Sequence, residues 1–268
     1  MDDYTVLCNS CGKDSMATLI LCHENGIKVD EVLISMPWYD KERGIYAVRP
    51  DQAEWIMQHA VPKMQSMGYK VTVLSGERDM LYHANKTIKK SKNPNRIGGY
   101  SFPFLVGRCG FHGEKFAPIN RYIRDLKKTY TVSEIVGIAY DEPKRFARLK
   151  EHQRSVLYEM RVMEEQTYDI CRGYDLLSPR YESGTRDGCF FCGAARPREM
   201  AELMRRWPEL YEEYKALLLR EKNLLKTVCF IPIEDYIAQA EMIANQISLF
   251  DLGGEGCGEK PMREGLPE

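Results

Sequence analysis

The sequence predicts an α/β fold, in which a mostly parallel sheet carries helices on both faces and a mainly helical part follows. The first half alternates short apolar, β-branched segments with segments of helical periodicity, which is typical of parallel sheets. A turn of small polar residues with one lysine lies between the first strand and the first helix. From about residue 150 the periodicity becomes helical and irregular, so we expect a second, helical part there.

The first strand is predicted at residues 5–7 and the first helix at residues 16–22, where apolar residues follow one another. Pro50 suits the first turn of a helix, and Pro62 predicts a bend later in the same helix. The other elements expected in this half are strands at 29–34, 70–74 and 134–139, helices at 77–90 and 119–130, and loops at 36–49 and 93–107.

In the second half, Gly173 ends a helix expected at residues 160–173, and Pro208 interrupts a charged helical stretch at 198–222. A loop bearing Gly and Cys is expected at 178–193, and a last helix at 233–247. The predicted organisation is an α/β domain at 1–150, a Cys-containing helical part at 151–252, and a Gly-, Pro- and charge-rich tail at 253–268 that we expect to be disordered. Apolar stripes on the helices of this part are read as core or as a subunit interface, so a homodimer is a candidate assembly.

Charge and composition narrow the class of protein. The chain has 268 residues, 38 basic and 39 acidic, so no overall field draws it to a nucleic acid or a membrane. It contains no run of about 18 apolar residues and no signal-like N-terminus, so we expect a cytoplasmic protein. The nine cysteines then predict free thiols, metal or cluster ligands, or redox groups rather than a disulfide scaffold. A local basic cluster at 86–96 is read either as a solvated helix end or as a site for an RNA or DNA backbone.

The turn after the first strand has the composition of an anion site. Backbone N–H groups at a helix N-terminus bind phosphate, Gly12 allows close approach, and Lys13 adds a positive charge. Ser10 and Ser15 contribute hydroxyl donors. The alternative is an ordinary strand–turn–helix with an exposed lysine. A Walker A loop is excluded, because it requires a glycine where Leu7 stands.

The order Ser-x-Gly-Lys-Asp-Ser resembles the PP-loop of the ATP pyrophosphatase and phosphoadenylylsulfate (PAPS) reductase superfamily, with Cys11 in place of the first glycine. Three more segments follow in the order shown by the PAPS reductase family. They are Gly-Arg-Cys at 107–109 with a later Lys and Pro-Ile up to 119, in the place of the family's Arg-x-Cys segment, Gly-Ile-x-x-Asp-Glu at 137–142, and Pro-x-Tyr with Gly-Cys-x-x-Cys at 179–192. Residues 4–192 therefore resemble a PAPS reductase-like protein, which implies an adenine nucleotide alpha hydrolase-like fold.

Several residues gain roles from this resemblance. Gly137 at a strand end would let a ligand approach, and Asp141 with Glu142 would bind Mg²⁺ or a ribose at the carboxyl edge of the sheet, unless they form a solvated acidic turn. Arg145 and Arg148 would bind phosphate or sulfate, or lie on the surface as simple charges. The expected catalytic residues are Lys13, Asp14 and Asp141, and the expected nucleotide-binding residues are Ser10, Gly12, Lys13, Asp14, Ser15, Gly137, Glu142 and Arg145.

Cys189 and Cys192 have the spacing of two ligands to one metal ion or cluster. Cys109 is the candidate third ligand and Cys171 the fourth. Relatives that carry a 4Fe–4S cluster imply that group here, although the adjacent Cys-Cys pair of cluster-bearing reductases is absent, so zinc and bare thiols remain alternatives. Three other cysteines are expected to be core thiols: Cys8, Cys22 and Cys229.

The intact Gly-Lys-Asp-Ser run favours an enzyme that cleaves ATP between the α and β phosphates with Mg²⁺, because reductases tend to lose it. The resemblance then implies adenylation linked to sulfur transfer onto tRNA, DNA or a small molecule, with a sulfur-donor protein as a candidate partner. One alternative is a PAPS or adenylylsulfate reductase whose nucleophile is Cys257, although the Glu-Cys-Gly-x-His setting of that nucleophile is incomplete. Another is a nucleotide-binding accessory protein without catalysis.

Overall fold

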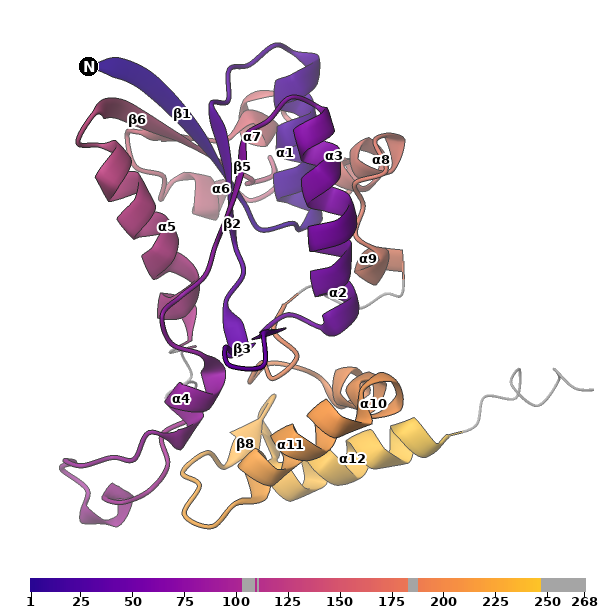
Figure 1. Cartoon of the computed structure of the whole chain (residues 1–268). Helices are drawn as coiled ribbons and strands as arrows, with labels where there is room; N and C mark the ends of the chain where they lie inside the picture. Colours follow the sequence, from indigo (N-terminus) through magenta and orange to yellow (C-terminus); the bar gives the residue numbers. More distant parts are fainter. Residues whose placement is uncertain (103–108, 110, 183–187, 247–268) are drawn as a thin grey trace, which may run out of the picture.

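The fold is built on a five-stranded parallel sheet with helices on both faces, as the sequence predicts (Figure 1). The computed structural model describes residues 1–102, 109, 111–182 and 188–246. The strand order is β5-β2-β1-β6-β7, and every neighbouring pair in it is parallel. The strands are β1 (Asp2–Asn9), β2 (Glu31–Ser35), β5 (Val71–Leu74), β6 (Tyr130–Val136) and β7 (Gln153–Arg154).

The central strand β1 is buried on both faces of the sheet. Leu7 pairs with Val32 on one side and with Ile135 on the other, and its side chain enters the core beneath α1 (Lys13–Glu24). The preceding residue, Val6, points the other way into the core beneath α5 (His112–Leu126). Successive apolar residues thus serve opposite layers, which explains why this strand reads as a continuous apolar run.

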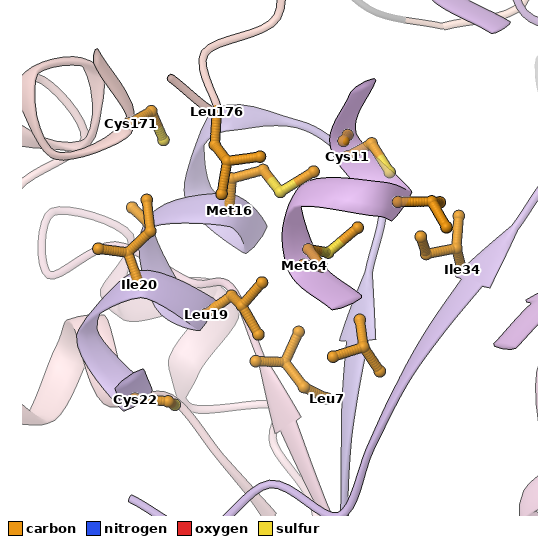
Figure 2. Close-up of a cluster of buried hydrophobic side chains, with 14 of the residues drawn as sticks. Leu7, Cys11, Met16, Leu19, Ile20, Cys22, Ile34, Met64, Cys171 and Leu176 are labelled. Atoms are coloured by element: carbon orange, nitrogen blue, oxygen red, sulfur yellow. The ribbon is translucent and has the colours of Figure 1, made fainter. Parts of the chain in front are cut away.

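The α1 side is covered by helices from three parts of the chain, and Figure 2 shows their shared core. Pro62 lies just after a π-helical turn, η1 (Ile56–Ala60), where the long predicted helix is irregular. Proline lacks an N–H and clashes with the preceding turn, so an irregularity there is expected. The covering helices are α2 (Pro50–Trp55), α3 (Val61–Ser66), α7 (Val156–Glu159) and α8 (Gln166–Gly173).

The C-terminal unit is a second packed layer below the carboxyl edge of the sheet (Figure 1). Its core joins its own helices to α4 (Met80–Asn85) and to a hairpin of the first half, which supplies the buried Tyr39. Its elements are α10 (Pro197–Arg206), α11 (Pro208–Leu219), β8 (Thr227–Val228), β9 (Ile231–Pro232) and α12 (Ile233–Asn245). The predicted break at Pro208 and the last helix are confirmed.

Several predicted boundaries need correction. The loop expected at 36–49 contains the hairpin β3 (Trp38–Asp40) and β4 (Ile45–Tyr46). The helix expected at 77–90 is only α4, because Asp79 caps its start and Lys86 is already extended. The helix expected at 119–130 is α5, which starts and ends earlier, and the loop at 178–193 contains the short α9 (Pro179–Glu182).

The helix expected at 160–173 is interrupted at Arg161, whose φ of 57° is left-handed, and only α8 remains of it. The domain boundary expected near residue 150 does not coincide with the end of the first packed unit, because β7 belongs to the sheet and α7 and α8 pack on its α1 side. The expected tail at 253–268 lies outside the described residues. Among the described helices, none is long and apolar enough to cross a membrane.

Candidate nucleotide site

The predicted anion turn lies at the carboxyl edge of the sheet, between the end of β1 and the start of α1. The Asn9 side-chain oxygen accepts the Cys11 N–H at 2.7 Å, and the Ser15 hydroxyl lies 2.9 Å from that same oxygen. The Ser10 hydroxyl lies 3.2 Å from the Ser15 hydroxyl. The turn is therefore shaped by its own polar side chains and lies at the N-terminus of α1, the kind of position at which anions bind in proteins.

Cys11 adopts a backbone conformation that favours glycine. Its φ is 59°, which is left-handed, and its side chain is fully buried. Such a conformation costs a non-glycine residue about 1–2 kcal/mol. The thiol packs among apolar side chains on the α1 side of the sheet (Figure 2), and this burial offsets part of the cost. The turn therefore accommodates a non-glycine residue at this position.

Lys13 does not lie exposed on the surface, contrary to the ordinary strand–turn–helix alternative. Its Nζ lies 2.7 Å from Asp14 Oδ1 and 2.7 Å from Glu164 Oε1, and the residue is 5% exposed. Burial lowers the pKa of this ammonium, but the hydrogen bonds and charges of the two carboxylates outweigh it and leave the pKa raised. Lys13 is therefore a charged group at the helix N-terminus, and its carboxylate partner Glu164 was missed by the sequence analysis.

Tyr181, from the Pro-x-Tyr segment, reaches this helix end. Its hydroxyl accepts the Lys13 backbone N–H at 3.2 Å. The segment lies more than 160 residues from the turn in sequence, and α9 carries it to the same place. The first and last of the four segments thus meet at the N-terminus of α1, which neither segment alone predicts.

Gly137 has a packing role that the sequence analysis did not consider. A Cβ at Gly137 would lie 2.8 Å from the Asp14 carbonyl carbon and 2.8 Å from the Ser15 nitrogen. The missing side chain therefore lets the first turn of α1 approach the end of β6.

The acidic pair after β6 separates into two environments. Asp141 Oδ1 accepts the Glu164 backbone N–H at 3.1 Å, which links it to the Lys13 group. Glu142 instead forms an ion pair with Arg145 at 2.5 Å. The structure thus brings Lys13, Asp14 and Asp141 around Glu164, while Glu142 and Arg145 neutralise each other beside them.

The four candidate metal ligands do not form one site. Cys171 is fully buried on α8, and its thiol donates to the Lys13 carbonyl at 3.2 Å (Figure 2). Burial raises the pKa of this thiol to about 12, which disfavours the thiolate that a metal needs. Within residues 1–102, 109, 111–182 and 188–246, no group of three or more His, Cys, Asp or Glu side chains is placed to bind a metal ion.

The Cys-x-x-Cys segment belongs to the core of the C-terminal unit. Cys189 and Cys192 are half-buried, Cys109 is exposed, and the Cys229 N–H donates to the Gly193 carbonyl at 2.7 Å. Cys192 thus has Cys229 near it rather than Cys171. Cys257 lies outside the described residues, as do Gly107 and Arg108 of the Gly-Arg-Cys segment.

A buried ionic cluster joins the sheet to the C-terminal unit, and the sequence analysis did not find it. The Arg180 guanidinium, of which 3% is exposed, contacts Glu202 on α10 at 2.5 Å and Asp51 on α2 at 3.4 Å. Arg49, also buried, lies 3.2 Å from Glu202. Because Arg180 immediately precedes Tyr181, this cluster positions the hydroxyl that contacts the helix end.

No family model and no curated protein matches the chain. Among solved structures, the chain is similar to "U34-tRNA thiolase NcsA from Methanococcus maripaludis with its [4Fe-4S] cluster", with 15% identity and a TM-score of 0.40 over 88% of this chain and 80% of that chain. The fold assignment rests on the parallel sheet, its strand order and the placement of the turn.

Proposed function

We propose that this chain is a PAPS reductase-like enzyme of the PP-loop superfamily that binds ATP and cleaves it between the α and β phosphates. The observation that carries the proposal is the buried Lys13 ammonium at the N-terminus of α1, directly after the central strand. A helix N-terminus and a lysine together attract a polyphosphate. The intact Gly-Lys-Asp-Ser run favours ATP over a nucleotide with no β,γ-phosphates.

The charges around Lys13 imply that ATP binds with a divalent cation. One ammonium faces two carboxylates there, Asp14 and Glu164, so the group is net negative before any phosphate arrives. Mg²⁺ bound to the nucleotide would screen this repulsion and neutralise charge on the phosphates. The side chain of Glu164 is 52% exposed, so it is free to move away from Lys13 when phosphate takes its place.

The reaction proposed is an in-line displacement. An acceptor oxygen attacks the α-phosphorus, the bond from that phosphorus to the bridging oxygen breaks, and pyrophosphate leaves with the electron pair. The acceptor carries AMP, and its proton passes to the Asp141 carboxylate. Lys13 and the N–H groups of α1 stabilise the developing charge on the phosphates. Sulfur then attacks the acceptor atom that bears the adenylated oxygen, and AMP leaves with that oxygen; the acceptor is a tRNA, a DNA or a small molecule.

No step of the proposed reaction uses a metal cluster, because Cys109, Cys171, Cys189 and Cys192 do not lie together in the structure. Sulfur would be supplied by a separate sulfur-donor protein. Such a donor also explains why an enzyme of this kind needs no reactive thiol at the nucleotide turn, where Cys11 is buried.

Isothermal titration calorimetry tests the proposal. The anaerobically purified protein is titrated with an ATP analogue that resists α,β-cleavage, with Mg²⁺, and separately with PAPS. We expect selective binding of the ATP analogue, lost in Lys13→Ala. Selective binding of PAPS would overturn the choice and make the chain a sulfonucleotide reductase with Cys257 as nucleophile.

Glu164 provides a sharper test of the site. Glu164→Gln removes the charge that competes for Lys13, so we expect tighter binding of the ATP analogue at low Mg²⁺, by about fivefold. Glu165→Gln is the matched control, since it makes the same charge change on the adjacent exposed residue. Equal effects of the two substitutions would mean that Glu164 has no special relation to the phosphates.

A further inference from the structure

Two basic segments that are distant in sequence form one surface, which we call the basic loop face. The first is the loop after α4, with five basic residues, and the second follows α11 and carries Lys222 (Figure 1). Tyr100 joins the two segments, because it forms an isolated β-bridge with Thr87 and a second one with Asn223. The cations of the basic loop face are Lys86, Lys89, Lys90, Lys92, Arg96 and Lys222.

Backbone and side-chain contacts fix this surface in place. The Tyr100 N–H donates to the Lys222 carbonyl at 3.0 Å, and the Ser101 N–H donates to the Lys86 carbonyl at 2.8 Å. The Arg220 guanidinium stacks on the Tyr100 ring at 3.8 Å and donates to Asn85 at 2.9 Å. These contacts therefore hold the two ends of the loop, at Lys86 and at Tyr100, against the segment that follows α11.

The first segment of the basic loop face has no acidic residue of its own, and the second has Glu221 next to Lys222. Between Asp79 and Glu114 the chain has no Asp or Glu. In the described residues none of the six cations forms an ion pair. Other lysines of the surface, by contrast, are paired with a carboxylate. Because the whole chain has a net charge of only -1, this local excess of positive charge is a specific feature and not a consequence of composition.

The chemistry of the surface fits a phosphodiester backbone. Lysines bind phosphate as point charges, and the polar side chains between them, such as Asn93 and Asn95, donate hydrogen bonds to phosphate or sugar. A membrane surface would instead favour a helix with an apolar face. The loop follows α4, and α4 follows the carboxyl end of β5. Because β5 and β1 are strands of the same parallel sheet, the loop lies beyond the same edge of the sheet as the nucleotide turn.

We propose that the basic loop face binds the backbone of a nucleic acid. This inference deepens the proposed function by giving the acceptor a docking surface. Its test needs no nucleotide, so that failure of one proposal leaves the other standing. The shared chemistry of RNA and DNA is the phosphodiester, and separate arms of the experiment distinguish them.

Fluorescence anisotropy with a labelled 20-nucleotide single-stranded RNA, the same DNA sequence and its duplex tests the proposal. With about five phosphates contacted, log K should fall with log salt at a slope of about -3.5, which weakens binding about 100-fold between 50 and 200 mM salt. Lys89→Ala/Lys90→Ala/Lys92→Ala should weaken binding at least about 10-fold and reduce that slope by about 2.

The matched control is Lys28→Ala/Lys127→Ala/Lys128→Ala, which removes the same charge at the opposite edge of the sheet, where each lysine faces a carboxylate. We expect it to change binding less than twofold. Equal loss in both triple variants, or no loss in the first, would overturn the proposal. So would binding of poly-glutamate or of anionic vesicles as tight as that of the nucleic acids. Melting curves of both variants show whether they are folded.

Discussion

Gly137→Ala is the substitution whose effect follows most directly from the geometry of the site. The added Cβ would lie 2.8 Å from the Ser15 nitrogen and 2.9 Å from its Cα. Both are backbone atoms of the first turn of α1, so no flexible side chain can relieve the contact. Either α1 or the end of β6 must move.

The cost of such overpacking is about 1–3 kcal/mol. For a chain of this size, 1 kcal/mol lowers Tm by about 2–4 °C, so a decrease of about 4–8 °C is expected for a mid-range 2 kcal/mol. Because the atoms that move include the N–H groups at the helix end, binding of the ATP analogue should weaken about tenfold. Differential scanning fluorimetry and calorimetry measure the two effects.

Gly113→Ala is the matched control. Gly113 lies in α5, and a Cβ there would meet nothing within 4 Å. Alanine in a helix should raise stability by about 0.5–1 kcal/mol and leave nucleotide binding unchanged. If Gly137→Ala kept both the wild-type Tm and the wild-type affinity, the reasoning that places α1 against Gly137 would be refuted.

Three more predictions concern the buried polar groups. Burial raises the pKa of Glu31, but hydrogen bonds from Thr72, Tyr4, Tyr122 and Lys70 outweigh it and lower the pKa below its ordinary 4.5. The ionised Glu31 carboxylate therefore stabilises the fold fully at a pH above the pKa that it has in the unfolded chain, and this stabilisation is lost as the pH falls below about 4.5. The loss of stability with falling pH should therefore be less steep in Glu31→Gln than in wild type. Arg180→Ala removes the nearest cation from Glu202, which keeps Arg49 at 3.2 Å, and should cost about 1–3 kcal/mol by urea unfolding, while Arg180→Lys should cost less. Cys171→Ser should leave any bound iron or zinc unchanged by elemental analysis, because this thiol donates to the Lys13 carbonyl; loss of metal in this variant, compared with Cys22→Ser, would contradict its assignment to the core.

The order of strands and helices could be predicted from the sequence wherever burial determines the spacing of apolar residues. Val6 and Leu7, with strand neighbours on both sides, are apolar because each faces one buried layer, and the helices that cover them show a helical period. The short α4 and the interrupted helix before α8 were not predictable in this way. Their ends are set by local events, an Asp79 cap and a left-handed Arg161, that the apolar pattern does not encode.

The candidate site divides in the same manner. The turn at Lys13 was recognisable because it is contiguous in sequence. Glu164 was not, because it lies in an irregular turn and its role depends only on where the chain returns in space. Gly137 was noticed, but its packing against α1 was not foreseen, because a glycine at a strand end accommodates a ligand or a neighbouring backbone equally well. The cysteines show the limit of spacing arguments, because Cys171 has suitable spacing and an unsuitable environment.

Product analysis with ATP labelled at the α-phosphorus tests the central claim most directly. The protein is incubated with Mg²⁺, labelled ATP and pools of RNA, DNA and small-molecule acceptors, and the products are separated by chromatography. The account predicts pyrophosphate together with labelled AMP, free or on an acceptor, and no ADP; Lys13→Ala should form neither. Formation of ADP and phosphate would contradict α,β-cleavage, and tight binding of ATP without turnover in any pool would identify a nucleotide-binding accessory protein instead.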